Sequence, residues 1–103
     1  MDIEYDDSEL IEIGDAAFAS CISLKEVVLP WNMEKIGKMA FAGCYRLKTI
    51  NIPSGVESIG QKAFSNCEAL EDITFNGKTE SDVIAIENFP FGLTKKKVIS
   101  LAT

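Results

Sequence analysis

One stretch of the sequence, Ile36-Gly37-Lys38-Met39-Ala40-Phe41-Ala42-Gly43-Cys44-Tyr45-Arg46-Leu47, has a counterpart on each side of it. The earlier copy runs from Ile13 to Leu24 and the later copy from Ile59 to Leu70, each displaced by 23 residues. The same residue types, Ile, Gly, Ala, Phe, Cys and Leu, occupy the same offsets in every copy. Because a residue type used at about 7% should fall three times at one offset well under ~1% of the time, these columns indicate a repeat architecture.

The first half of each repeat predicts a short helical turn, because its apolar residues are three to five positions apart. A glycine precedes each turn, where a backbone free of Cβ strain helps the chain to change direction. The alanine is small enough for neighbouring turns to stack closely, and the phenylalanine is expected to fill the space between the helical side and the strand side. These columns are Gly14, Gly37 and Gly60; Ala17, Ala40 and Ala63; and Phe18, Phe41 and Phe64.

The second half of each repeat alternates apolar and polar residues, as in Leu47-Lys48-Thr49-Ile50-Asn51-Ile52, and therefore predicts a strand with one buried face. Pro30 and Pro53 end the first two strands, since proline cannot continue a hydrogen-bond ladder. Stacked repeats would place these strands about 4.8 Å apart in a parallel sheet. The inward residues are expected to be Val27, Leu29, Ile50, Ile52, Ile73 and Phe75, with a further apolar column at Leu10, Met33 and Val56.

The pattern predicts a single domain over residues 1–103 that changes character at both ends. We expect a partial N-terminal turn at 1–12, with Ile3 and Tyr5 at strand positions, repeats at 13–35, 36–58 and 59–81, and a divergent C-terminal cap at 82–103. Near the cap, Thr79 or Ser81 is the predicted N-cap of a helix. Its apolar side would be Val83, Ile84 and Ile86, and a last strand is expected between Lys97 and Leu101.

The combined motif, Ile-Gly-x-x-Ala-Phe-x-x-Cys-x-x-Leu-x-x-Ile-x-Ile-Pro, resembles the BspA-like (Treponema pallidum-type) leucine-rich repeats, and residues 36–53 match it throughout. A unit of 23 residues lies in the leucine-rich-repeat range. The fold class implied is an α/β right-handed solenoid with a parallel β-sheet on the concave face and short helical turns on the convex face. The resemblance also implies a secreted or cell-surface protein that acts in adhesion or in binding host extracellular proteins. No signal peptide or anchor is recognised in this sequence.

Composition argues against several other functions. A net charge of −6 disfavours nucleic acid as a partner, and no apolar run approaches the ~18 residues that membrane insertion requires. The sequence has no histidine, so the usual general base is missing and we predict that the protein is not an enzyme. Stacked cysteines fit a core column better than a nucleophile, a zinc site or a disulfide, and neither a cofactor nor a metal is expected. The cysteines are Cys21, Cys44 and Cys67.

The remaining candidate site is the outward face of the strand sheet, because solenoids use such faces as extended binding surfaces. Trp31 has no apolar counterpart in the other repeats, so it is either a binding hot spot or a residue packed beneath the N-terminal strand or over Met33. The sequence thus predicts a protein–protein interaction module. Two alternatives stay open: a terminal segment of a longer repeat array, and a domain that self-associates through its N-terminal end. The predicted partner-binding residues are Glu26, Val28, Trp31, Thr49, Asn51, Asp72 and Thr74.

Overall fold

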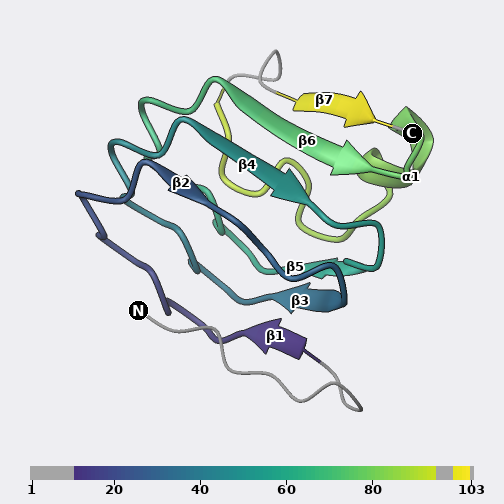
Figure 1. Ribbon diagram of the computed structural model, residues 1–103, viewed down its shortest axis with the longest axis horizontal. Helices are drawn as coiled ribbons and strands as arrows, with labels where there is room; N and C mark the ends of the chain where they lie inside the picture. Colours follow the sequence, from purple (N-terminus) through teal and green to yellow (C-terminus); the bar gives the residue numbers. More distant parts are fainter. Residues whose placement is uncertain (1–10, 95–98, 103) are drawn as a thin grey trace.

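The protein is described from a computed structural model, which defines residues 11–94 and 99–102. The chain winds through parallel strands that form two sheets, joined on one side by a column of turns (Figure 1). The predicted partial turn at 1–12, with Ile3 and Tyr5, lies largely outside the described residues. The elements are β1 (Ile11–Ile13), β2 (Glu26–Val27), β3 (Met33–Ile36), β4 (Thr49–Ile52), β5 (Ser58–Ile59), β6 (Asp72–Asn76), α1 (Glu80–Ile84) and β7 (Ile99–Ala102).

The longer sheet has the strand order β2-β4-β6-β7, and all of its neighbours are parallel. Between β2, β4 and β6, residues 23 apart are register partners, so Ile50 pairs with Ile73 and Ile52 with Phe75. The inward side chains of β4 are buried and the outward ones are exposed, as the alternation predicts. A parallel-strand solenoid of about four turns is therefore confirmed.

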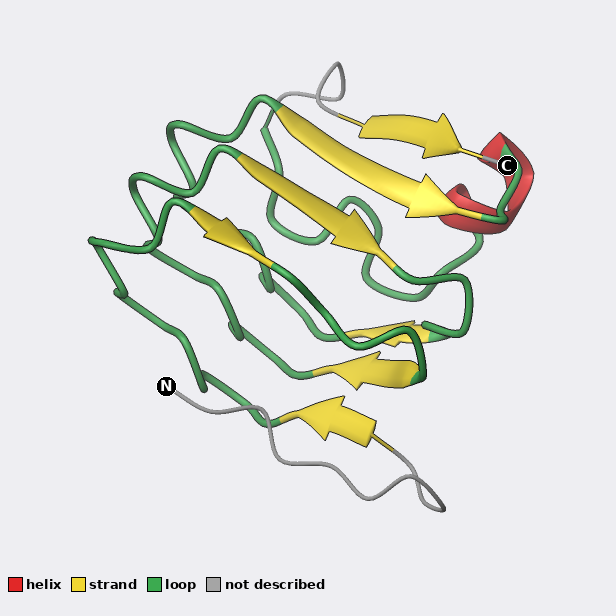
Figure 2. Ribbon diagram, in the orientation of Figure 1, coloured by secondary structure: helices red, strands yellow, loops and turns green. Residues whose placement is uncertain are grey.

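A second parallel sheet, β1-β3-β5, was not predicted from the sequence. Met33 and Ile36, at the two ends of β3, are buried, while the two residues between them are exposed. Lys35 pairs with Ser58, and Ile36 pairs with Ile59. The apolar column at Met33 and Val56 thus lies at the start of a second set of short strands. These strands lie opposite the longer sheet across the core (Figure 2).

The predicted helical turns are replaced by non-helical turns at residues 15–20, 38–43 and 61–66. Each turn contains two residues with positive φ, which is the left-handed region and cannot continue a right-handed helix. These residues are Ala16, Ser20, Met39, Gly43, Lys62 and Asn66. Backbone bonds run from each turn to the next, for example from Phe18 N–H to the Ala40 carbonyl at 2.8 Å. The turn column is therefore a hydrogen-bonded stack without helix.

The repeated glycine is required by close stacking. A Cβ atom on Gly60 would lie 2.2 Å from the Lys38 nitrogen, and one on Gly37 would lie 2.6 Å from the Gly14 carbonyl carbon. Neither glycine is among the residues with positive φ. The sequence-based explanation, that glycine eases a change of direction, is therefore wrong for these two positions.

The phenylalanine column forms the predicted ladder in the core. The rings of Phe18 and Phe41 are stacked with centroids 5.2 Å apart and planes 4° apart, and those of Phe41 and Phe64 are 5.6 Å and 2° apart. All three side chains are buried. Like residues from successive turns thus meet inside the solenoid, as the repeat predicts.

The C-terminal segment begins with α1, and Thr79 is its N-cap, one of the two predicted residues. Val83 and Ile86 are buried, but Ile84 is 54% exposed, so the prediction that Ile84 lies on the apolar side is wrong. The last strand is β7, paired with β6, whereas Lys97 lies outside the described residues. The Asn88 side-chain amide donates to the carbonyl of Ile59 at 3.0 Å, so this segment satisfies a backbone acceptor at the end of the shorter sheet.

Candidate functional site

The outward face of the longer sheet brings five of the predicted residues into two rows across neighbouring strands. One row is Glu26, Thr49 and Asp72, and the other contains Asn51 and Thr74. The side chains on β2 and β4 are exposed, whereas the two on β6 are half-buried. The face therefore becomes less accessible from β2 toward β6.

Asp72 is held by hydroxyl groups on its own face. The Thr74 Oγ1 atom donates to Asp72 Oδ2, and the Ser100 Oγ atom on β7 donates to Asp72 Oδ1, both at 2.5 Å. A carboxylate that accepts two such bonds is fixed in place and has fewer free lone pairs for a partner. Ser100 was missed as a candidate because its strand departs from the repeat, although β7 places it directly beside Thr74.

The remaining two predicted residues lie beyond the end of β2. Val28 is 88% exposed, and Trp31, in the turn between β2 and β3, is 84% exposed. The Trp31 ring is therefore not covered by packing over Met33, which is completely buried. These are the two most exposed large apolar side chains among the described residues.

The cysteine column borders the core: Cys44 is buried, as predicted, whereas Cys21 and Cys67 are half-buried and pack against the core. Cys44 Sγ donates to the carbonyl oxygen of Phe18 and Cys67 Sγ to that of Phe41, both at 3.1 Å. Burial raises the pKa of both thiols, and that of Cys67 reaches about 12. Because the thiolate is the reactive form, these thiols are poorly suited to nucleophilic catalysis or metal binding.

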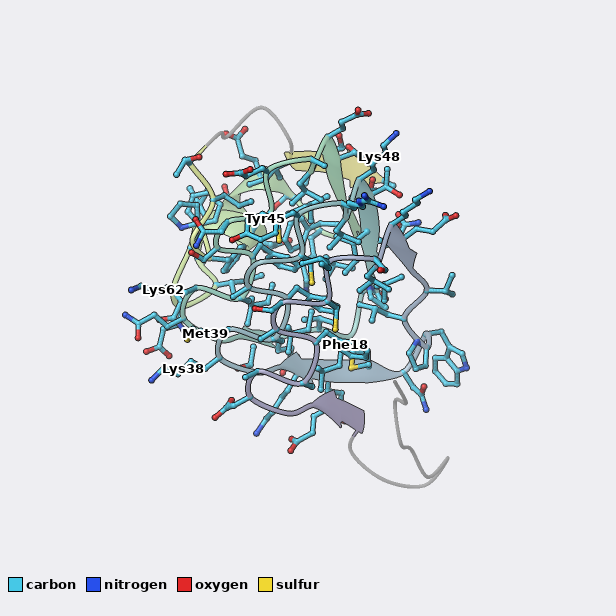
Figure 3. The ribbon with its side chains drawn as sticks, turned by 90° about the vertical axis from the view of Figure 1, so that its left-hand side faces the viewer. Phe18, Lys38, Met39, Tyr45, Lys48 and Lys62 are labelled. Atoms are coloured by element: carbon cyan, nitrogen blue, oxygen red, sulfur yellow. The ribbon has the colours of Figure 1, made fainter. Side chains whose placement is uncertain are left out.

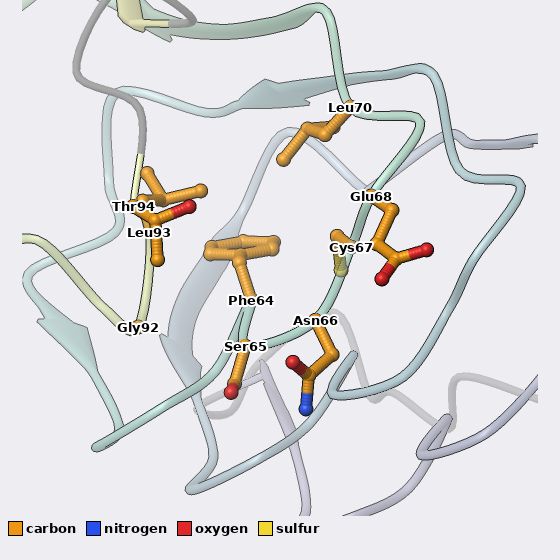
Figure 4. A pocket seen from close by; sticks show the side chains of 9 residues that line it. All are labelled: Phe64, Ser65, Asn66, Cys67, Glu68, Leu70, Gly92, Leu93 and Thr94. Carbon is orange, nitrogen blue, oxygen red and sulfur yellow. The ribbon is translucent and has the colours of Figure 1, made fainter.

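A pocket of about 400 Å³ lies beside Cys67, at the C-terminal end of the turn column (Figure 4). Phe64, Leu70 and Leu93 supply apolar walls, and Asn66 and Glu68 are among its polar groups. The Cys67 thiol is protonated at neutral pH, so the pocket offers no activated nucleophile. Within the described residues, no group of three or more His, Cys, Asp or Glu side chains is arranged to hold a metal ion.

Comparison with known proteins agrees with this geometry. The family model described as BspA type leucine-rich repeat region (6 copies) matches residues 2–102. The crystal structure of a leucine-rich repeat protein from Bacteroides ovatus ATCC 8483 is similar, with a TM-score of 0.69 and 30% sequence identity. The alignment covers 85% of this chain and 21% of that protein, so this chain spans about a fifth of its length. No curated protein matches this chain by sequence.

Across residues 11–94 and 99–102, no helix is both long enough and apolar enough to cross a bilayer.

Proposed function

Since the chain belongs to the BspA-type leucine-rich repeat family, we propose that it binds a host extracellular protein through the outward face of its longer sheet, as an adhesion module. Leucine-rich repeats generally mediate protein–protein interaction and are typically not enzymes. Solenoids commonly use an extended strand face for this purpose. The proposal assigns the contact to the seven predicted residues on and beside β2, β4 and β6.

The observation that carries the proposal is the exposure of Val28 and Trp31 beside the most accessible part of that face. Exposed apolar side chains can form the core of a protein contact, and tryptophan is enriched among binding hot spots. Glu26, Thr49 and Asn51 provide polar neighbours on β2 and β4. An apolar anchor with a polar surround is the usual anatomy of such an interface.

The test is binding of the immobilised protein to a panel of purified host extracellular-matrix proteins. The V28S/W31S double variant should weaken the interaction at least about thirtyfold, the effect of losing a hot spot of ~2 kcal/mol. Tyr45→Ser is the matched control, because Tyr45 is 49% exposed and lies on the turn side, away from the sheet (Figure 3). Equal losses for both variants, or no binding to any panel member, would reject the proposal.

A second candidate is a terminal segment of a longer array, and the first repeat gives a specific reason to consider it. A Cβ atom on Gly14 would meet no described atom within 4 Å, although the equivalent Gly37 and Gly60 have no room for one. Ala17 is exposed, whereas Ala40 and Ala63 are completely buried. The first turn thus carries the small residues needed for stacking on a face that the described residues leave open.

Sedimentation over a range of concentrations tests this candidate. Association through the N-terminal end should be abolished by Ala17→Arg, which obstructs stacking, and should survive V28S/W31S, which leaves that end unchanged. A protein that stays monomeric at all concentrations would exclude self-association through this end.

A further inference from the structure

A shallow depression on the molecule is basic, although the protein as a whole carries a net charge of −6. The depression measures about 520 Å³. Its lining residues are Lys25, Glu26, Arg46, Lys48, Thr49 and Ala69. All three basic side chains are exposed, so they present positive charge to a partner in solution.

The positions of these bases follow from the repeat. Lys25 and Lys48 immediately precede β2 and β4, and the Lys48 N–H donates to the Lys25 carbonyl at 2.9 Å, so the two residues are on adjacent turns. In the next turn the equivalent residue is Glu71, whose N–H donates to the Lys48 carbonyl at 2.8 Å. The positive charge of the depression therefore comes from the first two turns.

The first of these two turns also carries the two most exposed large apolar side chains among the described residues. Val28 is three residues beyond Lys25, which is about 10 Å along an extended chain, and Trp31 follows after a further three. Along the chain, the exposed residues of the first turn are therefore basic just before β2 and apolar just after it. Binding of an extended segment would allow one chain to contact both regions.

We propose that this surface of the first two turns binds an extended acidic segment of the partner protein, in which carboxylates are followed by a large apolar side chain. The carboxylates would contact Lys25, Arg46 and Lys48, and Arg46 offers paired donors that match carboxylate geometry. The apolar side chain would cover Val28 and Trp31. This inference rests on the proposed function and names the chemistry of its partner.

A sulfated polysaccharide is the less favoured partner for the same surface. Glu26 lines the depression itself, and Asp72 lies two strands away in the same row. A polymer with closely spaced negative charges would be repelled by these carboxylates and by the net charge of the protein. A protein segment can instead carry its carboxylates only at the positions that face Lys25, Arg46 and Lys48.

The probe is a fluorescein-labelled dodecapeptide with three glutamates followed by leucine and tyrosine, measured by fluorescence anisotropy against the full chain. The control peptide has lysine in place of each glutamate. K25E/K48E should weaken binding of the acidic peptide at least about tenfold, and raising the salt concentration should weaken binding to the unmodified protein. The matched variant is K38E/K62E, which makes the same charge change on the turn side (Figure 3).

Three results would overturn the inference: equal binding of the two peptides, equal effects of the two charge variants, or binding of heparin that depends on Lys25 and Lys48 without binding of the acidic peptide. The extracellular-matrix panel separates this failure from failure of the proposed function. If V28S/W31S abolishes binding to a panel member and K25E/K48E does not, the sheet face binds protein but its partner is not acidic.

Discussion

The Cys67 thiol donates a hydrogen bond to the carbonyl of Phe41 on the preceding turn, with Sγ 3.1 Å from the oxygen. Cys44 makes the same bond to Phe18. The repeated cysteine therefore joins adjacent turns and also contributes to the core. A thiol that is both partly desolvated and used as a donor favours its protonated form.

Cys67 should react slowly with alkylating agents while the protein is folded. Burial, together with repulsion from a charge on Cys44, raises the pKa of the Cys67 thiol from 9.0 to about 12. At pH 8 the folded protein should therefore contain about a thousandfold less Cys67 thiolate than an unperturbed thiol would. Alkylation by iodoacetamide, followed by peptide mass spectrometry, should modify Cys67 rapidly only after denaturation. Equal rates in folded and denatured protein would contradict this.

The raised pKa of the Cys67 thiol also makes the stability of the protein depend on pH. The folded state holds the Cys67 proton more tightly than the unfolded state, so the contribution is complete below pH 9 and is lost as the pH rises toward 12. Urea unfolding from pH 8 to 11 should show a smaller decline for Cys67→Ala than for the unmodified protein.

Asp82, in the capping box of α1, should make the stability of the protein depend on pH in the opposite direction. Asp82 Oδ2 accepts the Thr79 N–H at 2.9 Å, and this bond lowers the pKa of the Asp82 carboxyl below 3.8. Its contribution is present above the unfolded pKa and is lost as the pH falls through the lower folded value. Asp82→Asn should therefore be less stable than the unmodified protein at pH 7, and the gap should narrow at pH 2. A gap that is the same at both values would count against the capping box.

Two glycines at the same repeat position should respond to alanine by different amounts, because only Gly60 has no room for a Cβ atom. A Cβ on Gly60 would meet backbone atoms of Gly37 and Lys38 at 2.2–2.4 Å, so Gly60→Ala should cost at least ~2 kcal/mol. Gly14 has no described atom within 4 Å of that position, so Gly14→Ala should change stability by less than ~1 kcal/mol in either direction. Thermal unfolding of both variants measures this difference, and similar losses would show that the turns do not stack as described.

The phenylalanine ladder predicts a large cost for one truncation. Phe41 is fully buried between Phe18 and Phe64, and Phe41→Ala should reduce the free energy of unfolding by about 3–5 kcal/mol. Tyr45→Ala, at a half-exposed ring nearby in the chain, should cost less than ~1 kcal/mol. A Phe41→Ala loss below 1 kcal/mol would mean that the ring does not pack in the core.

The core could be predicted because the same residue type occurs at the same position in three successive repeats. The inward strand residues, the phenylalanine ladder, the cysteine column and the Thr79 cap could all be predicted from spacing and residue type. The second sheet could not, because β3 buries Met33 and Ile36 three residues apart and so lacks the alternation that marks a strand.

The turn column was predicted to be helical because the spacing of its apolar residues does not distinguish the two conformations. Apolar residues three to five apart fit a helical turn as well as a turn with two left-handed residues, and most of those residues, such as Met39 and Lys62, are not glycine. At the candidate site, strand alternation predicted which residues face outward. The basic depression was missed because Arg46 joins Lys25 and Lys48 only when adjacent turns stack.

All of these surfaces depend on successive turns lying in register, and contacts between phenylalanine rings test that arrangement most directly. In protein with protonated phenylalanine rings and deuteration elsewhere, nuclear Overhauser spectra should connect Phe18 with Phe41 and Phe41 with Phe64, but not Phe18 with Phe64. Absence of the two predicted connections, or a direct connection between Phe18 and Phe64, would contradict the stacked solenoid and the binding surface that it creates.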